Sequence, residues 1–232
     1  MKEIYIIRHG ETNYNINKIS QTTDYLEPIN KTGRLQAIKT GKYLRDYRIN
    51  DKSFDCIYSS PYKRTTQTAK IIGRITKCKN IQYIEELHEI EKGLLHASKE
   101  KQINNPLYNE FNDALKELDA IEDPIEKVLY EKNELRKIMA EKYKAEKMSN
   151  VDKRIKKFIK IIIESPYEKI IVITHQGTIA EFIRILLHID SFYVPIGDVT
   201  SSRNCTITYI VFKNNRFYLI TPPNTSHLKI YD

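Results

Sequence analysis

The feature that most constrains this chain of 232 residues is a short apolar run that ends abruptly in polar residues. Residues 4–7 are Ile-Tyr-Ile-Ile, a composition typical of a strand buried on both faces of a parallel sheet. Arg8, His9 and Gly10 follow at once. Ligands of open α/β sheets bind at the carboxyl ends of the strands. The run therefore predicts a central strand whose end presents a cation and an imidazole to a ligand.

Two further junctions of the same kind strengthen this interpretation. Residues 170–173, which follow Lys169, are another aliphatic run, and it closes on Thr174-His175-Gln176-Gly177 just before a helical pattern. A third predicted turn, after a strand over 54–58, carries Arg64 at the start of a helix, where free N–H groups favour an anion. A lone Arg-His pair is more simply a surface loop, and a lone helix arginine is usually solvated. Three such turns together predict a site.

The whole pattern predicts one α/β domain over residues 1–232, a three-layer α/β/α sandwich with a mainly parallel sheet. Helices are expected over 32–47, with Leu35 on the core side, over 152–164, and from 179 to 187. A strand is expected over 81–84, a long loop over 13–30, and a hairpin from 205–212 and 217–220. Residues 98–150 carry apolar residues at helical spacing throughout and predict a wholly helical insertion.

Composition places the chain among intracellular globular proteins. A hydrophobic fraction of 41% over this length allows a sizeable core. No apolar run reaches the roughly 18 residues of a membrane span, and the N-terminus leads straight into a core strand, so neither a membrane segment nor a signal peptide is expected. Three cysteines without Cys-x-x-Cys spacing favour neither disulfides nor zinc, and a cytoplasmic location is expected.

The net charge of +8 lies outside the insertion. Residues 98–150 hold 10 Lys and Arg against 12 Asp and Glu, so the rest of the chain carries +10. A basic surface steers anionic ligands, including phosphate esters and nucleic acid. Without a recognisable nucleic-acid module, we expect a small phosphorylated substrate and no nucleic-acid partner. The sequence leaves a homo-oligomer open.

With these junctions identified, the chain resembles the histidine phosphatase superfamily, also called the phosphoglycerate mutase-like family. The resemblance covers nearly the whole chain in the order of the family's motifs. The matching residues are Arg8-His9-Gly10-Glu11-Thr12, Asn15, Gln21, Lys31 to Ala37, Ser59 to Ala69, Leu87-His88-Glu89, Thr174-His175-Gln176-Gly177 and Asn204.

The resemblance implies a phosphoryl transfer without a metal or other cofactor. It implies His9 as the nucleophile, with Arg8, Arg64 and His175 around the phosphate. It also implies a phosphate contact for Asn15 and substrate contacts for Gln21, Gln176 and Gly177. Glu89 matches the family's catalytic carboxylate, although Glu85, Glu86 and Glu91 compete for the same role.

Three activities remain open at this stage. A phosphomonoesterase that works through a phosphohistidine is favoured, because Glu11-Thr12 and residues 90–95 differ from the usual mutase sequence. A phosphoglycerate mutase and a non-catalytic protein that binds a phosphate ligand are the alternatives. A metal site at the two histidines is disfavoured because no His-x-x-x-His or Glu-x-x-His pattern links them. The helical insertion is expected to cap the pocket mouth.

Overall fold

The computed structural model describes residues 1–17, 25–46, 53–95, 106–123, 126–127, 130, 136–186, 188 and 203–230. The strands of this part are β1 (Lys2–Arg8), β2 (Cys56–Ser59), β3 (Ile81–Tyr83), β4 (Lys169–Thr174), β5 (Ile207–Lys213) and β6 (Arg216–Asn224). The α-helices are α1 (Asn13–Ile16), α2 (Lys31–Asp46), α3 (Lys63–Thr76), α5 (Pro106–Ala120), α7 (Arg136–Lys142), α8 (Met148–Glu164), α9 (Gln176–Leu186) and α11 (His227–Ile230). Two short 3-10 helices are η2 (Glu85–Leu87) and η3 (Gly93–Leu95).

The strands form one six-stranded sheet in the order β3-β2-β4-β1-β5-β6. β1 pairs in parallel with β4, which pairs in parallel with β2, and β2 pairs in parallel with β3. The hairpin β5-β6 adds two antiparallel pairings beside β1. The prediction of a mainly parallel sheet is confirmed, and β1 lies near the centre of that sheet.

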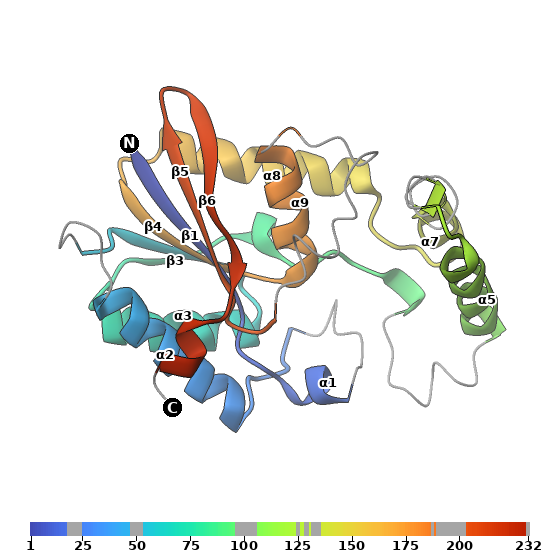
Figure 1. Cartoon of the computed structure of the whole chain (residues 1–232), viewed down its shortest axis with the longest axis horizontal. Helices are drawn as coiled ribbons and strands as arrows, with labels where there is room; N and C mark the ends of the chain where they lie inside the picture. The colour runs from blue at the N-terminus through green and yellow to red at the C-terminus, as the bar shows by residue number, and fades with distance from the viewer. Residues whose placement is uncertain are drawn as a thin grey trace.

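Alternate side chains of β1 fill two separate cores. Ile4 and Ile6 pack in the cluster that includes Phe158 of α8 and Phe182 of α9. Tyr5 and Ile7 pack in the other cluster, with residues of α2 and α3. This alternation follows from the period of two along a strand. Helices consequently cover both faces of the sheet, which confirms the three-layer α/β/α architecture (Figure 1).

The three predicted turns meet at one edge of this sheet. The backbone N–H of His9 donates to Thr174 O at 3.0 Å, and the N–H of Ser60 donates to Ile173 O, also at 3.0 Å. The parallel pairing therefore continues one residue past β1 and β2 and brings the ends of β1, β2 and β4 together. β1 runs from the N-terminus toward the side of the molecule where α1, α5 and α7 lie (Figure 1).

The prediction that Leu35 belongs to the core is wrong. Its side chain is 52% exposed, whereas Gly33, Ala37 and Gly41 of the same helix are buried. Leu35 lies two residues from both Gly33 and Ala37, which turns it about 200° away from each of them. The core side of α2 instead uses small residues, because a Cβ on Gly41 would lie only 3.0 Å from Ile75 of α3.

Two other local predictions need correction. The predicted loop over 13–30 contains helix α1, because Thr12 and Asn15 form a reciprocal capping box at its start. The insertion is not wholly helical either, since residues 143–147 leave α7 and run without helical structure to α8. Within that stretch the N–H of Glu146 donates to Glu91 O at 2.9 Å, and Tyr143 O accepts from the N–H of Leu94 at 2.6 Å. These backbone pairings replace the helical bonds there.

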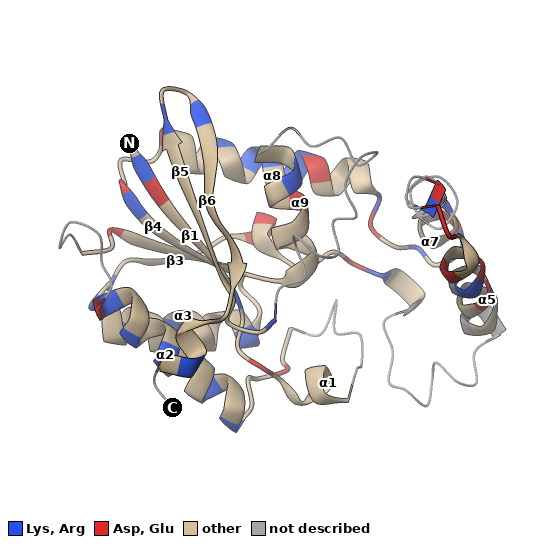
Figure 2. Ribbon diagram, viewed as in Figure 1, with Lys and Arg blue, Asp and Glu red and all other residues tan. Residues whose placement is uncertain are grey.

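Charge is distributed as the sequence predicts. Lys and Arg recur along α2 and α8, while acidic residues gather on α5 (Figure 2). In the described part of the chain, no helix is long and apolar enough to cross a membrane. Cys56, Cys78 and Cys205 are free thiols, and all three are buried.

The C-terminal helix supplies a testable pH effect. His227 is buried, its Nε2 lies 3.0 Å from Thr40 Oγ1 of α2, and burial lowers its pKa to about 4. An unfolded histidine has a pKa of about 6.5. The unfolded chain therefore takes up this proton first, and the stability contributed by neutral His227 is complete above about pH 6.5 and is lost as the pH falls toward 4. We expect the Tm of the wild type to fall more steeply over that window than the Tm of His227→Gln. Parallel Tm curves in thermal unfolding would contradict this assignment.

Candidate active site

His9 lies at the end of β1 with its ring held in one tautomer. The side chain is 2% exposed, and Nδ1 lies 2.8 Å from the carbonyl of Gly10. A carbonyl only accepts, so Nδ1 carries the proton and Nε2 keeps its lone pair. The backbone carbonyl of His9 accepts from Asn204 Nδ2 at 3.0 Å. The imidazole is thus oriented with a nucleophilic nitrogen available.

Close backbone contacts fix the turn after His9. A Cβ on Gly10 would lie 2.5 Å from the carbonyl oxygen of Gly33 at the start of α2, so only glycine permits this approach. The N–H of Gly10 donates to Thr68 Oγ1 at 3.0 Å, and the Thr68 hydroxyl in turn donates to Arg64 O of α3 at 2.7 Å. Helices α2 and α3 therefore both position the His9 turn.

His175 faces His9 from the end of β4. The two ring centroids are 5.3 Å apart, and the rings are tilted by 60°. Nε2 of His175 lies 2.9 Å from Ser60 Oγ, and its buried Nδ1 has no hydrogen-bond partner within the described residues. The ring of Tyr62 packs edge-on against His175 with centroids 5.1 Å apart. The end of β2 thus orients the second histidine.

Two arginines give this site its positive potential. Arg64 is fully buried, with its guanidinium carbon 5.0 Å from the centroid of the Tyr62 ring. Burial lowers the pKa of Arg8, and the nearby Glu89 carboxylate opposes that shift. Burial, Arg64 and Arg8 together hold the pKa of His9 well below its usual 6.5. The pKa of His175 is lowered in the same way by burial and by Arg64. Two cations beside two neutral imidazoles favour a bound anion.

Glu89, on the loop after η2, lies beside the residues that follow His175. Its carboxylate accepts from the N–H of Ile90 at 2.9 Å and from the N–H groups of Gly177 and Thr178 at 3.4 and 3.3 Å. The latter two N–H groups belong to the first turn of α9, so the start of this helix orients the Glu89 carboxyl group. Of the four candidate glutamates, Glu89 is thereby placed beside the helix that follows His175. Glu86 instead forms an ion pair with Lys157 at 2.5 Å.

Of the predicted phosphate and substrate contacts, Asn15, Gln176 and Gly177 lie among the described residues and Gln21 does not. Asn15 Oδ1 accepts from the Thr12 N–H and from Asn204 Nδ2, both at 3.1 Å, whereas its Nδ2 makes no hydrogen bond within the described residues. Gln176 is exposed at the first position of α9. Gly177 lies against Glu89, because a Cβ there would come within 2.7 Å of the carboxylate. Gln21 lies outside the described residues.

Ser60 and Thr68 received no role from the sequence, although both lie inside the motif from Ser59 to Ala69. Their hydroxyls contact His175 and the Gly10 N–H, contacts that exist only once the strands and helices pack. The pair Ser59-Ser60 at the end of β2 is the sequence signal that could have indicated such a role. Among the described residues, no three His, Cys, Asp or Glu side chains are grouped to hold a metal ion.

The comparison with protein families gives one match across the chain. Residues 4–225 match the family described as the histidine phosphatase superfamily (branch 1). Over 74 residues the chain is 42% identical to the uncharacterized phosphatase PhoE of Bacillus subtilis, covering 32% of this chain and 35% of that protein. It is 38% identical over 96 residues to the broad-specificity phosphatase YOR283W of Saccharomyces cerevisiae, covering 40% of each. The matched segments thus span well under two thirds of these relatives.

Solved structures share the fold over almost the full length. Phosphoglycerate mutase from Bacillus anthracis aligns with a TM-score of 0.74 at 21% identity, covering 98% of this chain and 95% of that one. Phosphoserine phosphatase from Entamoeba histolytica, in complex with 3-phosphoglyceric acid, aligns with a TM-score of 0.67 at 22% identity, covering 98% and 100%. These likenesses concern the fold alone. The family match over residues 4–225 shows that the chain belongs to the histidine phosphatase superfamily.

Proposed function

We propose that the chain is a phosphomonoester hydrolase that works through a phosphohistidine at His9. The observation that carries this proposal is a His9 whose Nδ1 is fixed on Gly10 O while burial, Arg64 and Arg8 together depress its pKa. A neutral imidazole is the nucleophilic form. The same two cations favour the phosphate dianion and the charge on its equatorial oxygens during transfer.

The reaction proceeds in two displacements. Nε2 of His9 attacks phosphorus, the ester P–O bond breaks, and Glu89 gives a proton to the departing alcohol. Water then attacks the phosphohistidine, the P–N bond breaks, and the proton lost by water returns to Glu89. Inorganic phosphate leaves and His9 is neutral again. The bonds from the α9 N–H groups aim the Glu89 carboxyl during both steps.

The proposed substrate is a small phosphorylated metabolite. We propose Asn15 Nδ2 as a further phosphate donor, and Gln21, Gln176 and Gly177 as substrate contacts. Gln176 is exposed at the start of α9. The names of the relatives point the same way, since they include phosphatases and a protein in complex with 3-phosphoglyceric acid. The buried free cysteines support a cytoplasmic location. The insertion remains proposed as a cap of the pocket.

Mutase activity is the second candidate, favoured by the fold shared with phosphoglycerate mutase. The test is incubation with 3-phosphoglycerate, with and without a bisphosphorylated primer, and with p-nitrophenyl phosphate. We expect release of phosphate from p-nitrophenyl phosphate and no efficient isomerisation. Primer-dependent formation of 2-phosphoglycerate with little free phosphate would replace the hydrolase by a mutase. Binding of phosphate with no turnover of any substrate would favour a non-catalytic protein.

Gly177→Ala gives a separate prediction about Glu89. The added Cβ would lie 2.7 Å from Glu89 Oε1, so the carboxyl group must move. We expect the variant to stay folded and to lose rate progressively on aryl phosphates of rising leaving-group pKa, because poor leaving groups depend most on an acid. Gly41→Ala is the matched control, since its Cβ meets only the Ile75 side chain, 3.0 Å away in another helix. A loss that is equal across the series would contradict this role of Gly177.

A further inference from the structure

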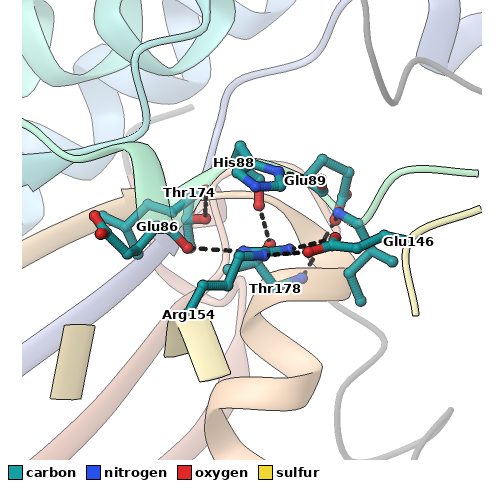
Figure 3. Close-up of polar contacts among 9 residues, drawn as sticks. Glu86, His88, Glu89, Glu146, Arg154, Thr174 and Thr178 are labelled. Carbon is teal, nitrogen blue, oxygen red and sulfur yellow. Dashed lines mark hydrogen bonds and ion pairs between the residues drawn. The ribbon is translucent and has the colours of Figure 1, made fainter. Parts of the chain in front are cut away.

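The loop that carries Glu89 is fixed from three different elements. Three successive carbonyls before Glu89 each accept a side-chain donor. Arg154 Nη1 of α8 donates to Glu86 O at 2.7 Å, Thr174 Oγ1 of β4 donates to Leu87 O at 2.6 Å, and Thr178 Oγ1 of α9 donates to His88 O at 2.6 Å (Figure 3). The loop is thereby held to the strand and the helix on either side of His175.

Arg154 also fixes the loop on the far side of Glu89. Its Nε and Nη2 donate to the two carboxylate oxygens of Glu146 at 2.9 and 3.1 Å (Figure 3). The backbone N–H of Glu146 then donates to Glu91 O at 2.9 Å. One guanidinium thus joins the chain three residues before Glu89 to the chain two residues after it.

The same contacts form the base of the insertion. The segments entering and leaving it lie side by side through the Glu146 to Glu91 and Leu94 to Tyr143 backbone bonds. Gly93 has a φ of 57°, and a Cβ there would overlap the carbonyl of Tyr143. Arg154 therefore connects the base of the insertion to the loop that presents the proposed acid.

We infer that Arg154, through its fork to Glu146 and Glu86, is a positioning residue that sets the place of the Glu89 carboxyl relative to the phosphate site. This inference rests on the proposed function. The pair is mostly buried, with side chains 10% and 11% exposed, so it is shielded from the solvent screening that weakens surface ion pairs. The three donors of Arg154 are spread over three nitrogens in one plane, which matches acceptors on two separate segments, whereas a lysine presents all its donors from a single nitrogen and lacks this fork.

The test measures rates on a series of aryl phosphates from p-nitrophenyl phosphate to phenyl phosphate. In Arg154→Gln, the least activated ester should slow by about 10- to 100-fold, the range expected when a reacting group is misplaced by about 1 Å. The rate on p-nitrophenyl phosphate should change little, because its leaving group needs no proton. Arg154→Lys should recover only part of the loss. Glu146→Gln, which keeps shape and reach, provides the second variant if Arg154→Gln folds poorly.

Arg184→Gln is the matched control. Arg184 is a similarly buried α9 arginine, 17% exposed, and it donates to Asp152 of α8 at 2.6 Å without contacting the Glu89 loop. The substitution Arg184→Gln should change the thermal stability but not the way in which the rate depends on the leaving group. The positioning role would be overturned if Arg154→Gln lost rate equally on all esters, or if Arg184→Gln showed the same dependence of rate on the leaving group as Arg154→Gln.

Two further variants separate this inference from the proposed function. If His9→Ala keeps the wild-type rate, the proposed function fails and the positioning role fails with it. If His9→Ala is inactive and Glu89→Gln shows the dependence on the leaving group while Arg154→Gln does not, only the inference about Arg154 is overturned.

Discussion

Replacing His9 with alanine is expected to abolish hydrolysis of p-nitrophenyl phosphate, with a loss of about 10⁴-fold or more, as for other enzyme nucleophiles. The reason is that Nε2 of His9 is the nitrogen whose lone pair remains once Nδ1 is fixed on Gly10 O. Initial rates of both proteins at equal concentration, with circular dichroism to show folding, give the answer.

An exposed histidine provides the control for His9→Ala. His188 lies at the surface after α9 and has no part in the site, so His188→Ala should keep the wild-type rate. A folded His9→Ala that retained a tenth or more of the activity would remove His9 from the nucleophile's role, because such a loss is far below about 10⁴-fold.

Arg64→Met is expected to lower kcat/KM by about 10²- to 10³-fold, the usual effect of removing one donor to the transition state. The fully buried guanidinium is also a cause of the low pKa of His9. Removing it should raise that pKa, so the variant's activity should be lost at a higher pH than the wild type's as the solution is acidified. The pH profile of kcat/KM measures both effects in one experiment.

Stability separates this effect from damage to the fold. A buried guanidinium carries a desolvation cost that a methionine side chain does not, so the Tm of Arg64→Met should not fall greatly. Arg74→Met is the matched control in the same helix, because Arg74 is exposed. An unchanged kcat/KM in folded Arg64→Met, or an unchanged acid limb of its pH profile, would contradict the proposed role of Arg64.

Much of the fold follows from local sequence in this chain. The strands β1 and β4 contain the apolar runs 4–7 and 170–173, each followed by a polar turn, and runs of that kind are typical of parallel strands buried on both faces. Because parallel strands end at the same edge, Arg8, His9 and His175 had to meet once both runs were strands. The prediction that Arg64 belongs to the site rested on its position at the start of the helix after β2.

The remaining features depend on contacts that sequence periodicity does not encode. Leu35 fits an apolar stripe, but the tight approach of α2 to α3 selects a different side of the helix. The sequence alone does not distinguish three functional side chains from ordinary polar residues. Only in the folded chain does Ser60 contact His175, Thr68 contact the Gly10 N–H, and Arg154 contact the Glu89 loop. Asn15 likewise serves as a cap of α1, a role set by its pairing with Thr12.

The most direct test of the account is the identity of the phosphorylated residue during turnover. The enzyme is mixed with p-nitrophenyl phosphate, quenched within the first turnover in alkali, which preserves phosphohistidine, and digested for mass spectrometry. We expect one phosphoryl group on the peptide that contains His9, labile to acid and missing from His9→Ala. A phosphoryl group on another residue, or none while phosphate is still being released, would contradict it.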